Sequence, residues 1–330
     1  MATQPLQILL YGVLVYDLLD TLQDKLNMPA TITRLKENAP PEVLAEHLAN
    51  ADVVIALHYE HMPPAPKLRL LQVPGAGLDR IKFDLVPQQA TICNAYGHDV
   101  AGGEYVVLAM LAWCHEFVPA HESLKAGSWV MSGRTGAPLH EELYGKTVGI
   151  LGLGPIGLAA ARLAKAFGTT VLGCNRTQRD KPSFVDGLYP ISGLHDFLAR
   201  CDFVAVCIAQ TPQTIGLINR DSFQHMKPNA AIINVARGLV IDEGALYEAL
   251  RDRRIAGAII DAWYNYPTPD NLHIPPSKHP FHELPNVLMT PHSSIWTRGM
   301  IARRWTQIAN NIDAYASGKA LCNVVREAVI

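Results

Sequence analysis

Short apolar runs alternate with longer amphipathic stretches along the whole 330-residue chain. The first series of apolar runs predicts strands over residues 7–10, 53–57, 70–73 and 91–93. The second series predicts strands over residues 147–151, 170–174, 203–208, 231–235, 258–261 and 287–290. Helical patterns cover residues 40–49, within the first series, and 101–124, between the two series. This alternation is typical of βαβ units, and it predicts parallel sheets flanked by helices.

Two series of strands predict two domains, which the length of the chain also favours. A last amphipathic pattern over 300–315 predicts a helix that the second series does not need, so we expect it to return to the first domain. The expected fold is α/β, with two doubly wound parallel-sheet domains, Rossmann-like or flavodoxin-like, and a cleft between them. The expected boundaries are 1–100 and 295–330 for a discontinuous substrate-binding domain, and 101–294 for a dinucleotide-binding domain.

Composition narrows the choice of partner. Thirty acidic residues against 28 lysines and arginines give a net charge of −2, which offers no basic surface for nucleic acid or for a membrane. The apolar run at 8–16 is too short to span a bilayer, and no positive charge precedes it as in a signal peptide. The six cysteines form no Cys-x-x-Cys pair, which favours reduced thiols in a cytoplasmic protein over disulfides or a metal site. The expected partner is a small molecule.

One predicted strand leads directly into Gly152-Leu-Gly-Pro-Ile-Gly157, and a helical pattern over 158–167 follows. Because this G-x-G-x-x-G lies between a strand and a helix, it fits the dinucleotide-binding fingerprint. Gly152 permits the tight turn, Gly154 lets the backbone approach the pyrophosphate, and Gly157 lets the helix and strand pack closely. N–H groups at the start of the helix would face the phosphate charge. A glycine turn without a ligand is the alternative.

The next predicted strand ends at Asn175, where enzymes that use NAD usually place an acidic residue that binds the ribose hydroxyls. This chain has a neutral side chain there, followed by Arg176, Thr177 and, slightly later, Arg179. A guanidinium suits the 2′-phosphate of NADP because it can form charge-assisted hydrogen bonds. The sequence therefore favours NADP over NAD, with a solvated basic turn as the alternative.

Further motifs follow in a fixed order. They are Val73-Pro-Gly-Ala-Gly-Leu-Asp79, Thr211-Pro-Gln-Thr-Ile-Gly-Leu-Ile218, Asn234-Val-Ala-Arg-Gly-Leu-Val-Ile-Asp242, Leu284-Pro-Asn-Val-Leu-Met-Thr-Pro-His292 and Asn323-Val-Val325. Together with the glycine motif, this set resembles the D-isomer-specific 2-hydroxyacid dehydrogenases over most of the chain. The resemblance implies a cofactor domain inserted into a substrate domain.

The resemblance also implies roles for single residues. Arg237 would bind the carboxylate of a 2-oxo acid and polarise its carbonyl, although an isolated arginine is more often a surface ion-pair partner. His292 would exchange a proton with the substrate, although it is one of 13 histidines. Asp261 would bind the nicotinamide carboxamide, with a strand-end cap as the alternative. The other expected cofactor contacts are Pro155, Ile156, Cys207, Thr214, Ala236 and Ser294. The expected substrate contacts are Gly75, Ala76 and Gly77, whose N–H groups would form a nest for an anion, with an ordinary turn as the alternative. Trp296 is expected to line the substrate side of the cleft, with burial at an interface as an equal alternative.

The chain departs from the family at Tyr266, where the family normally has a glutamate paired with the catalytic histidine. A carboxylate beside histidine stabilises the imidazolium and raises its pKa, whereas neutral tyrosine offers only a hydrogen bond. We therefore expect His292 to be less basic than in typical relatives. Glu283 or Asp270 are alternative sources of the carboxylate.

Together with the turn after Asn175, the resemblance implies an NADPH-preferring reductase of a small 2-oxo acid such as glyoxylate or hydroxypyruvate. The resemblance also implies a homodimer. The apolar pattern over 105–114 is a candidate interface, with plain core as the alternative. The segment 261–269 also looks like formate dehydrogenases, which place a neutral amide at the glutamate position, so formate-like chemistry is a minority alternative. A dinucleotide-sensing protein without turnover is the alternative from another class, and the retention of Arg237 and His292 argues against it.

Overall fold

The computed structural model describes residues 4–12, 22–177, 180–268 and 271–329. Residues 13–16 of the first apolar run, Arg179 and Asp270 lie outside the described residues. The chain divides into two compact units, Met1–Gly97 with Thr297–Ile330 and His98–Trp296. Both junctions lie within three residues of the boundaries expected from the sequence.

Six strands form the sheet of the first unit, in the order β13-β5-β4-β3-β1-β2. Their bounds are β1 Leu6–Tyr11, β2 Ala30–Leu35, β3 Val53–Ala56, β4 Leu70–Gln72, β5 Thr91–Cys93 and β13 Val324–Arg326. The first five strands are parallel, and β13 pairs with β5 in the antiparallel direction. The parallel strands follow the flavodoxin-like order 2-1-3-4-5.

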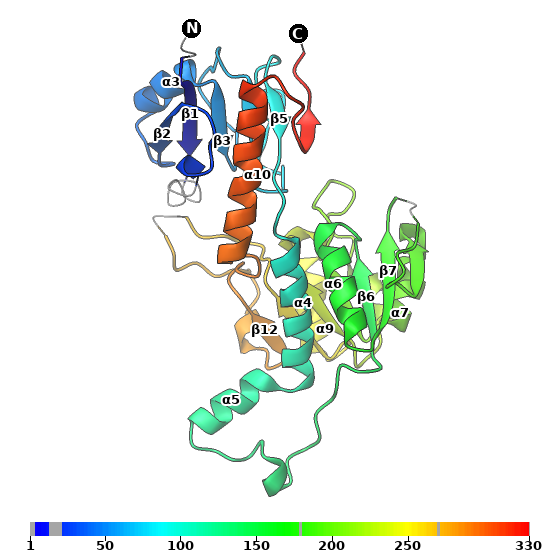
Figure 1. The fold of residues 1–330 in the computed structure, drawn as a ribbon. Coiled ribbons are helices and arrows are strands. Elements are labelled where there is room, and N and C mark those ends of the chain that lie inside the picture. The colour runs from blue at the N-terminus through cyan, green and yellow to red at the C-terminus, as the bar shows by residue number, and fades with distance from the viewer. Residues whose placement is uncertain (1–3, 13–21, 178–179, 269–270, 330) are drawn as a thin grey trace. The chain divides into compact units, whose positions relative to one another are not determined.

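Helices cover both faces of this sheet (Figure 1). α3 (Pro41–Asn50) packs in the apolar cluster that contains Leu9 of β1. α10 (Arg298–Ala316) packs in the cluster that contains Ile8, the neighbouring residue, whose side chain points to the opposite face. The helix expected over 300–315 is therefore α10, and its return to the first unit is confirmed.

Seven parallel strands form the sheet of the second unit, in the order β12-β11-β10-β9-β6-β7-β8. Their bounds are β6 Thr147–Leu151, β7 Thr170–Asn175, β8 Gly187–Pro190, β9 Phe203–Val206, β10 Ala231–Asn234, β11 Gly257–Ile260 and β12 Val287–Met289. The order is that of the Rossmann fold with one added strand. It reverses between β6 and β9, which are neighbours in the sheet although two strands separate them in sequence.

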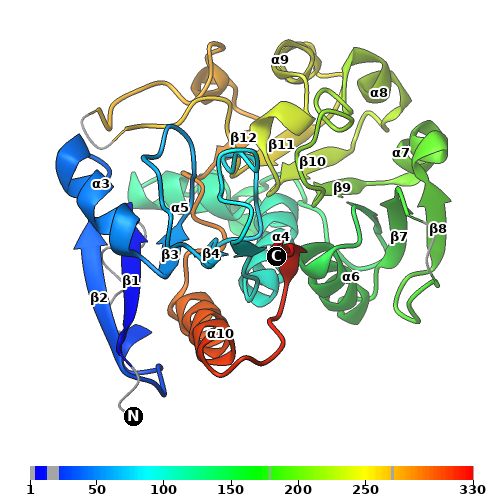
Figure 2. The same cartoon turned by 90° about the horizontal axis from the view of Figure 1, so that it is seen from above.

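The helices of the second unit also form two layers (Figure 2). Their bounds are α4 Asp99–Cys114, α5 Phe117–Lys125, α6 Pro155–Ala166, α7 Leu194–Arg200, α8 Arg220–His225 and α9 Glu243–Arg251. Short 3-10 helices occupy Gly133–Thr135, Ile191–Gly193, Gly238–Val240 and Phe281–Glu283. α4 and α6 share one apolar cluster with the sheet, whereas α7, α8 and α9 contribute to the other.

The prediction of a single helix over 101–124 is wrong, because two helices, α4 and α5, cover this segment. The chain breaks at Glu116, which has φ +48° in the left-handed region, and α5 begins at the next residue. The strands β2, β8 and β13 were not expected. All six cysteines are free thiols. Within the described ranges, the helices lack the combination of length and apolar character that crossing a bilayer demands.

Candidate functional site

The glycine turn after β6 has the geometry of a dinucleotide site. Gly152 has φ +97°, and a β-carbon at Gly157 would overlap the carbonyl oxygen of Gly152, so the chain's own packing requires both glycines. Gly154, the N-cap residue of α6, differs from them because a β-carbon there would meet no protein atom within 4 Å. Pro155 and Ile156 form the first turn of the helix. The open space at Gly154 and the N–H groups of this turn fit a pyrophosphate group.

The turn lies where the strand order of the sheet reverses. Cys207 follows β9, and its N–H donates to the carbonyl of Leu151 at 2.8 Å. A β-carbon at Gly152 would meet the backbone of Cys207, so these two segments are in contact. Thr214 belongs to the loop after β9, and its hydroxyl closes that loop by donating to the carbonyl of Ala209 at 2.8 Å. The predicted contact residue Cys207 is thus beside the glycine turn, as expected for a ligand at a switch point.

Asn175 joins the glycine turn to the end of β7. Its Oδ1 accepts a hydrogen bond from the N–H of Leu153 at 3.4 Å, and its Nδ2 donates to the carbonyl of Thr177 at 2.8 Å. Arg176 and Thr177 are exposed. The place of the ribose-binding carboxylate is therefore taken by an amide that fixes a turn with an exposed arginine.

Arg237 follows β10 in a turn that Asn234 fixes. The buried Asn234 side chain accepts from the N–H of Ala236 and donates to the carbonyl of Arg237, both at 3.1 Å. The half-buried guanidinium of Arg237 donates to the carbonyl of Ala236 at 2.9 Å. A β-carbon at Gly238 would overlap the carbonyl oxygen of Trp263. The turn that carries Arg237 is therefore pressed against the segment after β11.

His292 lies in the loop after β12, which the carboxylate of Asp261 organises. Asp261 is 1% exposed, and its Oδ1 accepts from the hydroxyl of Thr290 at 2.6 Å and from the N–H of Ser293 at 2.9 Å. Its Oδ2 accepts from the N–H of Ser294 at 3.1 Å. Between these bonds His292 has φ +56°, which is unusual and costly for a residue other than glycine. Asp261 therefore holds the histidine backbone in place, and its contact with the carboxamide stays a prediction.

Tyr266 contacts the side chain of His292 directly. Its hydroxyl oxygen lies 2.7 Å from Nδ1 of His292 and accepts a hydrogen bond from the N–H of Trp263 at 3.1 Å. A hydroxyl has one proton and two acceptor positions, so it can donate to a neutral imidazole or accept from the N–H of an imidazolium. Tyr266 can therefore hold Nδ1 in both protonation states of the imidazole.

Trp263 joins three loops of the site, and sequence analysis did not single it out. Besides its N–H bond to Tyr266, its indole Nε1 donates to the carbonyl of Thr290 at 2.8 Å, and its own carbonyl packs against Gly238. These contacts bring together the segments after β10, β11 and β12, which are neighbours in the sheet. The only signal in the sequence was its place between Asp261 and Tyr266.

The predicted substrate contacts are distributed over both units. The loop at 75–77 follows β4 in the first unit and is half-buried. Its carbonyl groups accept hydrogen bonds at 3.1 Å from the side chain of Asn94 and the N–H of Ala95, which fixes its peptide planes. Trp296 is the last residue of the second unit and is 51% exposed. Their roles in substrate binding stay predictions.

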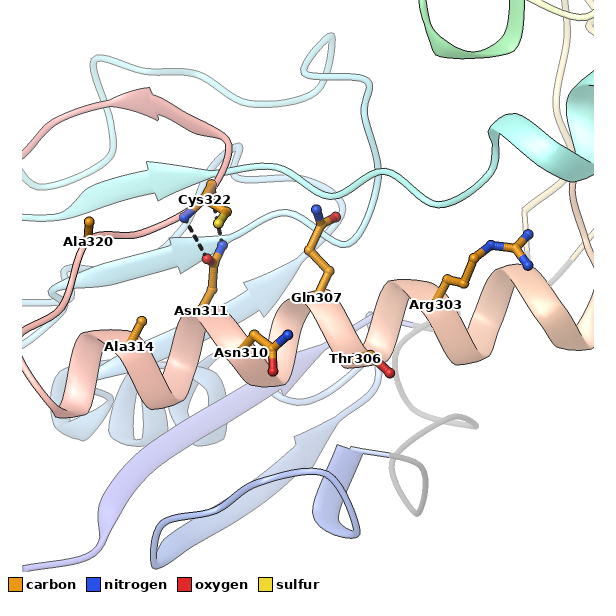
Figure 3. Close-up of a pocket in the computed structure, with 8 residues that line it drawn as sticks. All are labelled: Arg303, Thr306, Gln307, Asn310, Asn311, Ala314, Ala320 and Cys322. Atoms are coloured by element: carbon orange, nitrogen blue, oxygen red, sulfur yellow. Dashed lines mark hydrogen bonds between the residues drawn. The ribbon is translucent and has the colours of Figure 1, made fainter. Parts of the chain in front are cut away.

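A cavity of about 260 Å³ lies along α10 in the first unit, and it contains none of the predicted residues (Figure 3). Asn311 donates there to the carbonyl of Cys322 and accepts from its N–H, at 2.9 and 2.8 Å. Gln307 accepts from the N–H of Tyr96 at 2.7 Å. These bonds attach neighbouring segments to α10, so the polar lining of the cavity is used within the unit itself.

The family model of the D-isomer specific 2-hydroxyacid dehydrogenase NAD-binding domain matches residues 107–294, more than half of the chain. The D-3-phosphoglycerate dehydrogenase of Methanocaldococcus jannaschii is 32% identical over 291 residues, which are 86% of this chain and 53% of that protein. The chain thus spans about half the length of that relative. The glyoxylate reductase of Korarchaeum cryptofilum is 29% identical over 308 residues, 89% of either chain.

Solved structures share the fold of the whole chain. An NADPH-dependent glyoxylate/hydroxypyruvate reductase from Sinorhizobium meliloti, in complex with NADP and malonate, has a TM-score of 0.80 and 25% identity, covering 99% of this chain and 100% of that one. A 2-hydroxyacid dehydrogenase from Ketogulonicigenium vulgare has a TM-score of 0.81 with the same coverage, and at 23% identity it supports the fold alone. The family model and the two Rossmann-like units together show that the chain belongs to the D-isomer-specific 2-hydroxyacid dehydrogenase family.

Proposed function

We propose that the chain is an NADPH-preferring oxidoreductase that reduces a small 2-oxo acid, such as glyoxylate or hydroxypyruvate, to the 2-hydroxy acid. The observation that carries this proposal is the contact between the side chains of His292 and Tyr266. Trp263 connects the loops of these two residues to the turn that contains Arg237. The glycine turn lies at the same carboxyl edge of the sheet. The printed activities of the Korarchaeum cryptofilum and Sinorhizobium meliloti relatives support the same substrate class.

Each reacting group of the substrate has a matching group in the chain. A bound NADPH supplies the hydride that the carbonyl carbon accepts. The guanidinium of Arg237 can bind the carboxylate through two parallel hydrogen bonds and stabilise the negative charge that develops on the carbonyl oxygen. His292 donates a proton from Nε2 to that oxygen, while the Tyr266 hydroxyl holds Nδ1. The product is the neutral alcohol with its carboxylate retained.

A panel of substrates tests this proposal. Oxidation of NADPH with glyoxylate or hydroxypyruvate, lost in Arg237→Gln and His292→Gln, is the expected result. Formate with NADP⁺ belongs in the panel because Tyr266, like the amide of formate dehydrogenases, is a neutral partner of histidine. Turnover of formate alone would overturn the 2-oxo acid proposal. Tight binding of NADPH without turnover of any compound would favour a dinucleotide-sensing protein.

The residues at the end of β7 support the proposed preference for NADPH over NADH. An amide at Asn175 cannot accept two ribose hydroxyls as a carboxylate does, and the exposed Arg176 offers a partner for a 2′-phosphate. Arg176→Ala should weaken NADPH binding by about tenfold and leave NADH binding unchanged. Arg251→Ala, an exposed arginine on α9, is the matched control. Equal losses for NADPH and NADH in Arg176→Ala would contradict a contact with the 2′-phosphate.

We propose a homodimer whose interface is formed by α5 and the segment after it, and not by the pattern over 105–114. α4 buries Val106 and Met110 in the core, so the pattern over 105–114 is mainly core. By contrast, α5 has no buried residue, and the segment that follows projects from the second unit (Figure 1). Large apolar side chains are exposed there, namely Phe117, Val118, Leu124, Trp129, Val130, Leu139 and Tyr144. An exposed apolar surface of this kind marks an interface, and a two-fold axis would pair it with its own copy.

Sedimentation of the full chain tests the dimer. Trp129→Glu places a charge in the apolar segment and should give a monomer. Leu272→Glu, at an equally exposed leucine outside this segment, should remain a dimer. A monomeric wild type, or a dimeric Trp129→Glu variant, would overturn this interface.

A further inference from the structure

The helices α7 and α8 pack against each other (Figure 2). Three of their side chains with metal-binding atoms lie close together. They are His195, Asp221 and His225, and one ligand atom from each lies within 4.8 Å of the other two. Nε2 of His195 is 3.5 Å from Oδ2 of Asp221. The two imidazole rings stack with their centroids 3.9 Å apart and an angle of 11° between the planes.

A backbone hydrogen bond holds one ring nitrogen of His225. Its Nδ1 lies 2.9 Å from the backbone carbonyl oxygen of Asp221, one helical turn earlier. A carbonyl can only accept a hydrogen bond, so Nδ1 carries the proton and Nε2 carries the lone pair. Histidines that bind metals are commonly held by such a bond from the other ring nitrogen to a carbonyl group.

The carboxylate of Asp221 is placed for the same purpose. The neighbouring Arg220 forms its ion pair with Glu248 on α9. Asp221 instead faces the two imidazoles, and its Oδ2 lies 3.5 Å from Nε2 of His195. A carboxylate beside two imidazoles is a donor set that suits a divalent cation.

We propose that His195, Asp221 and His225 form a surface binding site for Zn²⁺, with water as the fourth ligand. Two nitrogen donors and one oxygen donor match the preference of zinc, whereas Ca²⁺ and Mg²⁺ require mostly oxygen. Around tetrahedral Zn²⁺ the ligand atoms would be about 3.3 Å apart. The three side chains are 44%, 68% and 41% exposed, so they can close around the ion without moving the core.

The site would be independent of the proposed reaction. His195 lies on the helix before β9, whereas Asp221 and His225 lie on the helix after it. A bound ion would therefore cross-link two helices on one face of the second unit and raise its resistance to unfolding. The spacing of the cysteines carries no information about this site, because its ligands come from separate helices and include no cysteine.

Titration of the full, untagged chain with Co²⁺, followed by competition with Zn²⁺, tests the proposal through the visible absorption of tetrahedral cobalt. One equivalent of ion should bind, and Zn²⁺ should raise the unfolding temperature. His195→Gln and His225→Gln should each weaken binding by at least about tenfold. Because neither histidine is buried, circular dichroism should show that both variants remain folded.

Two matched controls separate this site from other metal-binding side chains. His140→Gln removes one ring of a second histidine pair, in which the centroids of His115 and His140 are 5.1 Å apart. Cys322→Ser removes the exposed thiol. Both controls should bind the ion as the wild type does. No uptake by the wild type, or equal uptake by His195→Gln and His225→Gln, would overturn the proposal.

Discussion

The hydroxyl oxygen of Tyr266 lies 2.7 Å from Nδ1 of His292, so the residue that stands where the family has glutamate contacts the proposed proton donor. The same oxygen accepts the N–H of Trp263, which fixes the phenol relative to the backbone after β11. Tyrosine thus keeps the orienting function of the glutamate. It does not supply the negative charge that would stabilise an imidazolium.

Replacing Tyr266 by glutamate should extend ketone reduction to higher pH. Reduction requires protonated His292, so its rate falls as the pH rises through the pKa of this group. A carboxylate at position 266 raises that pKa, and the alkaline limb of kcat/KM should move upward by about one pH unit. The measurement is the pH profile of glyoxylate reduction for the wild type and Tyr266→Glu.

Tyr266→Phe is the matched control because it retains the ring and removes the hydroxyl. It should lower kcat/KM by about tenfold without moving the alkaline limb upward. Superimposable profiles for Tyr266→Glu and the wild type would remove Tyr266 from the mechanism.

The glycine turn predicts opposite behaviour for two alanine variants. A β-carbon at Gly157 overlaps the carbonyl of Gly152, so Gly157→Ala should lower the free energy of unfolding by about 2 kcal/mol or more. A β-carbon at Gly154 meets no protein atom and should leave stability within about 0.5 kcal/mol of the wild type. It would occupy space proposed for the pyrophosphate, so NADPH binding should weaken by about tenfold. Urea unfolding and NADPH titration measure both effects, and unchanged affinity in Gly154→Ala would contradict this placement of the phosphates.

The strands that sequence patterns revealed are mostly central ones. Central strands are buried on both faces, so they appear as continuous apolar runs. The three strands that were not expected, β2, β8 and β13, lie at edges of the sheets. β2 contains two threonines and an arginine among its six residues, and β8 ends in a proline, so neither forms an apolar run. The break at Glu116 was equally hidden, because the residues on both sides favour a helix.

Motifs placed the candidate residues after the strands of one sheet, but they did not reveal the contacts that support them. Each of Gly152, Arg237 and His292 follows a strand, and parallel strands bring such positions to one sheet edge. The bonds of Trp263 to Tyr266 and Thr290 depend on how three loops pack. That packing is tertiary, so no spacing along the sequence encodes it. The same holds for Asp261, whose three bonds surround His292.

His58, which follows β3 in the first unit, should make stability depend on pH. Burial disfavours its charged form, and Arg80 adds repulsion, so its pKa is lowered despite the weaker opposing effects of Glu37 and Glu60. The unfolded chain, with a pKa of about 6.5, takes up the proton first as the pH falls. Stability should therefore decrease as the pH falls below about 6.5 and continue to decrease until the folded-state pKa is reached.

His58→Gln should remove this part of the pH dependence. Urea unfolding at about pH 8 and about pH 5 should show a larger loss of stability in the wild type than in the variant. His47→Gln, at a histidine in the last turn of α3, is the matched control and should follow the wild type. An equally steep loss in His58→Gln would exclude His58 as the cause.

The most direct measurement is the single-turnover oxidation of bound NADPH by glyoxylate, in the wild type and in His292→Gln, with NADPH affinity measured in parallel. We expect the rate to fall by about a hundredfold or more in the variant, because glutamine cannot supply the proton as histidine does, while NADPH affinity stays within about twofold. Oxidation of NADPH by His292→Gln at the wild-type rate would contradict the role of His292 as the proton donor.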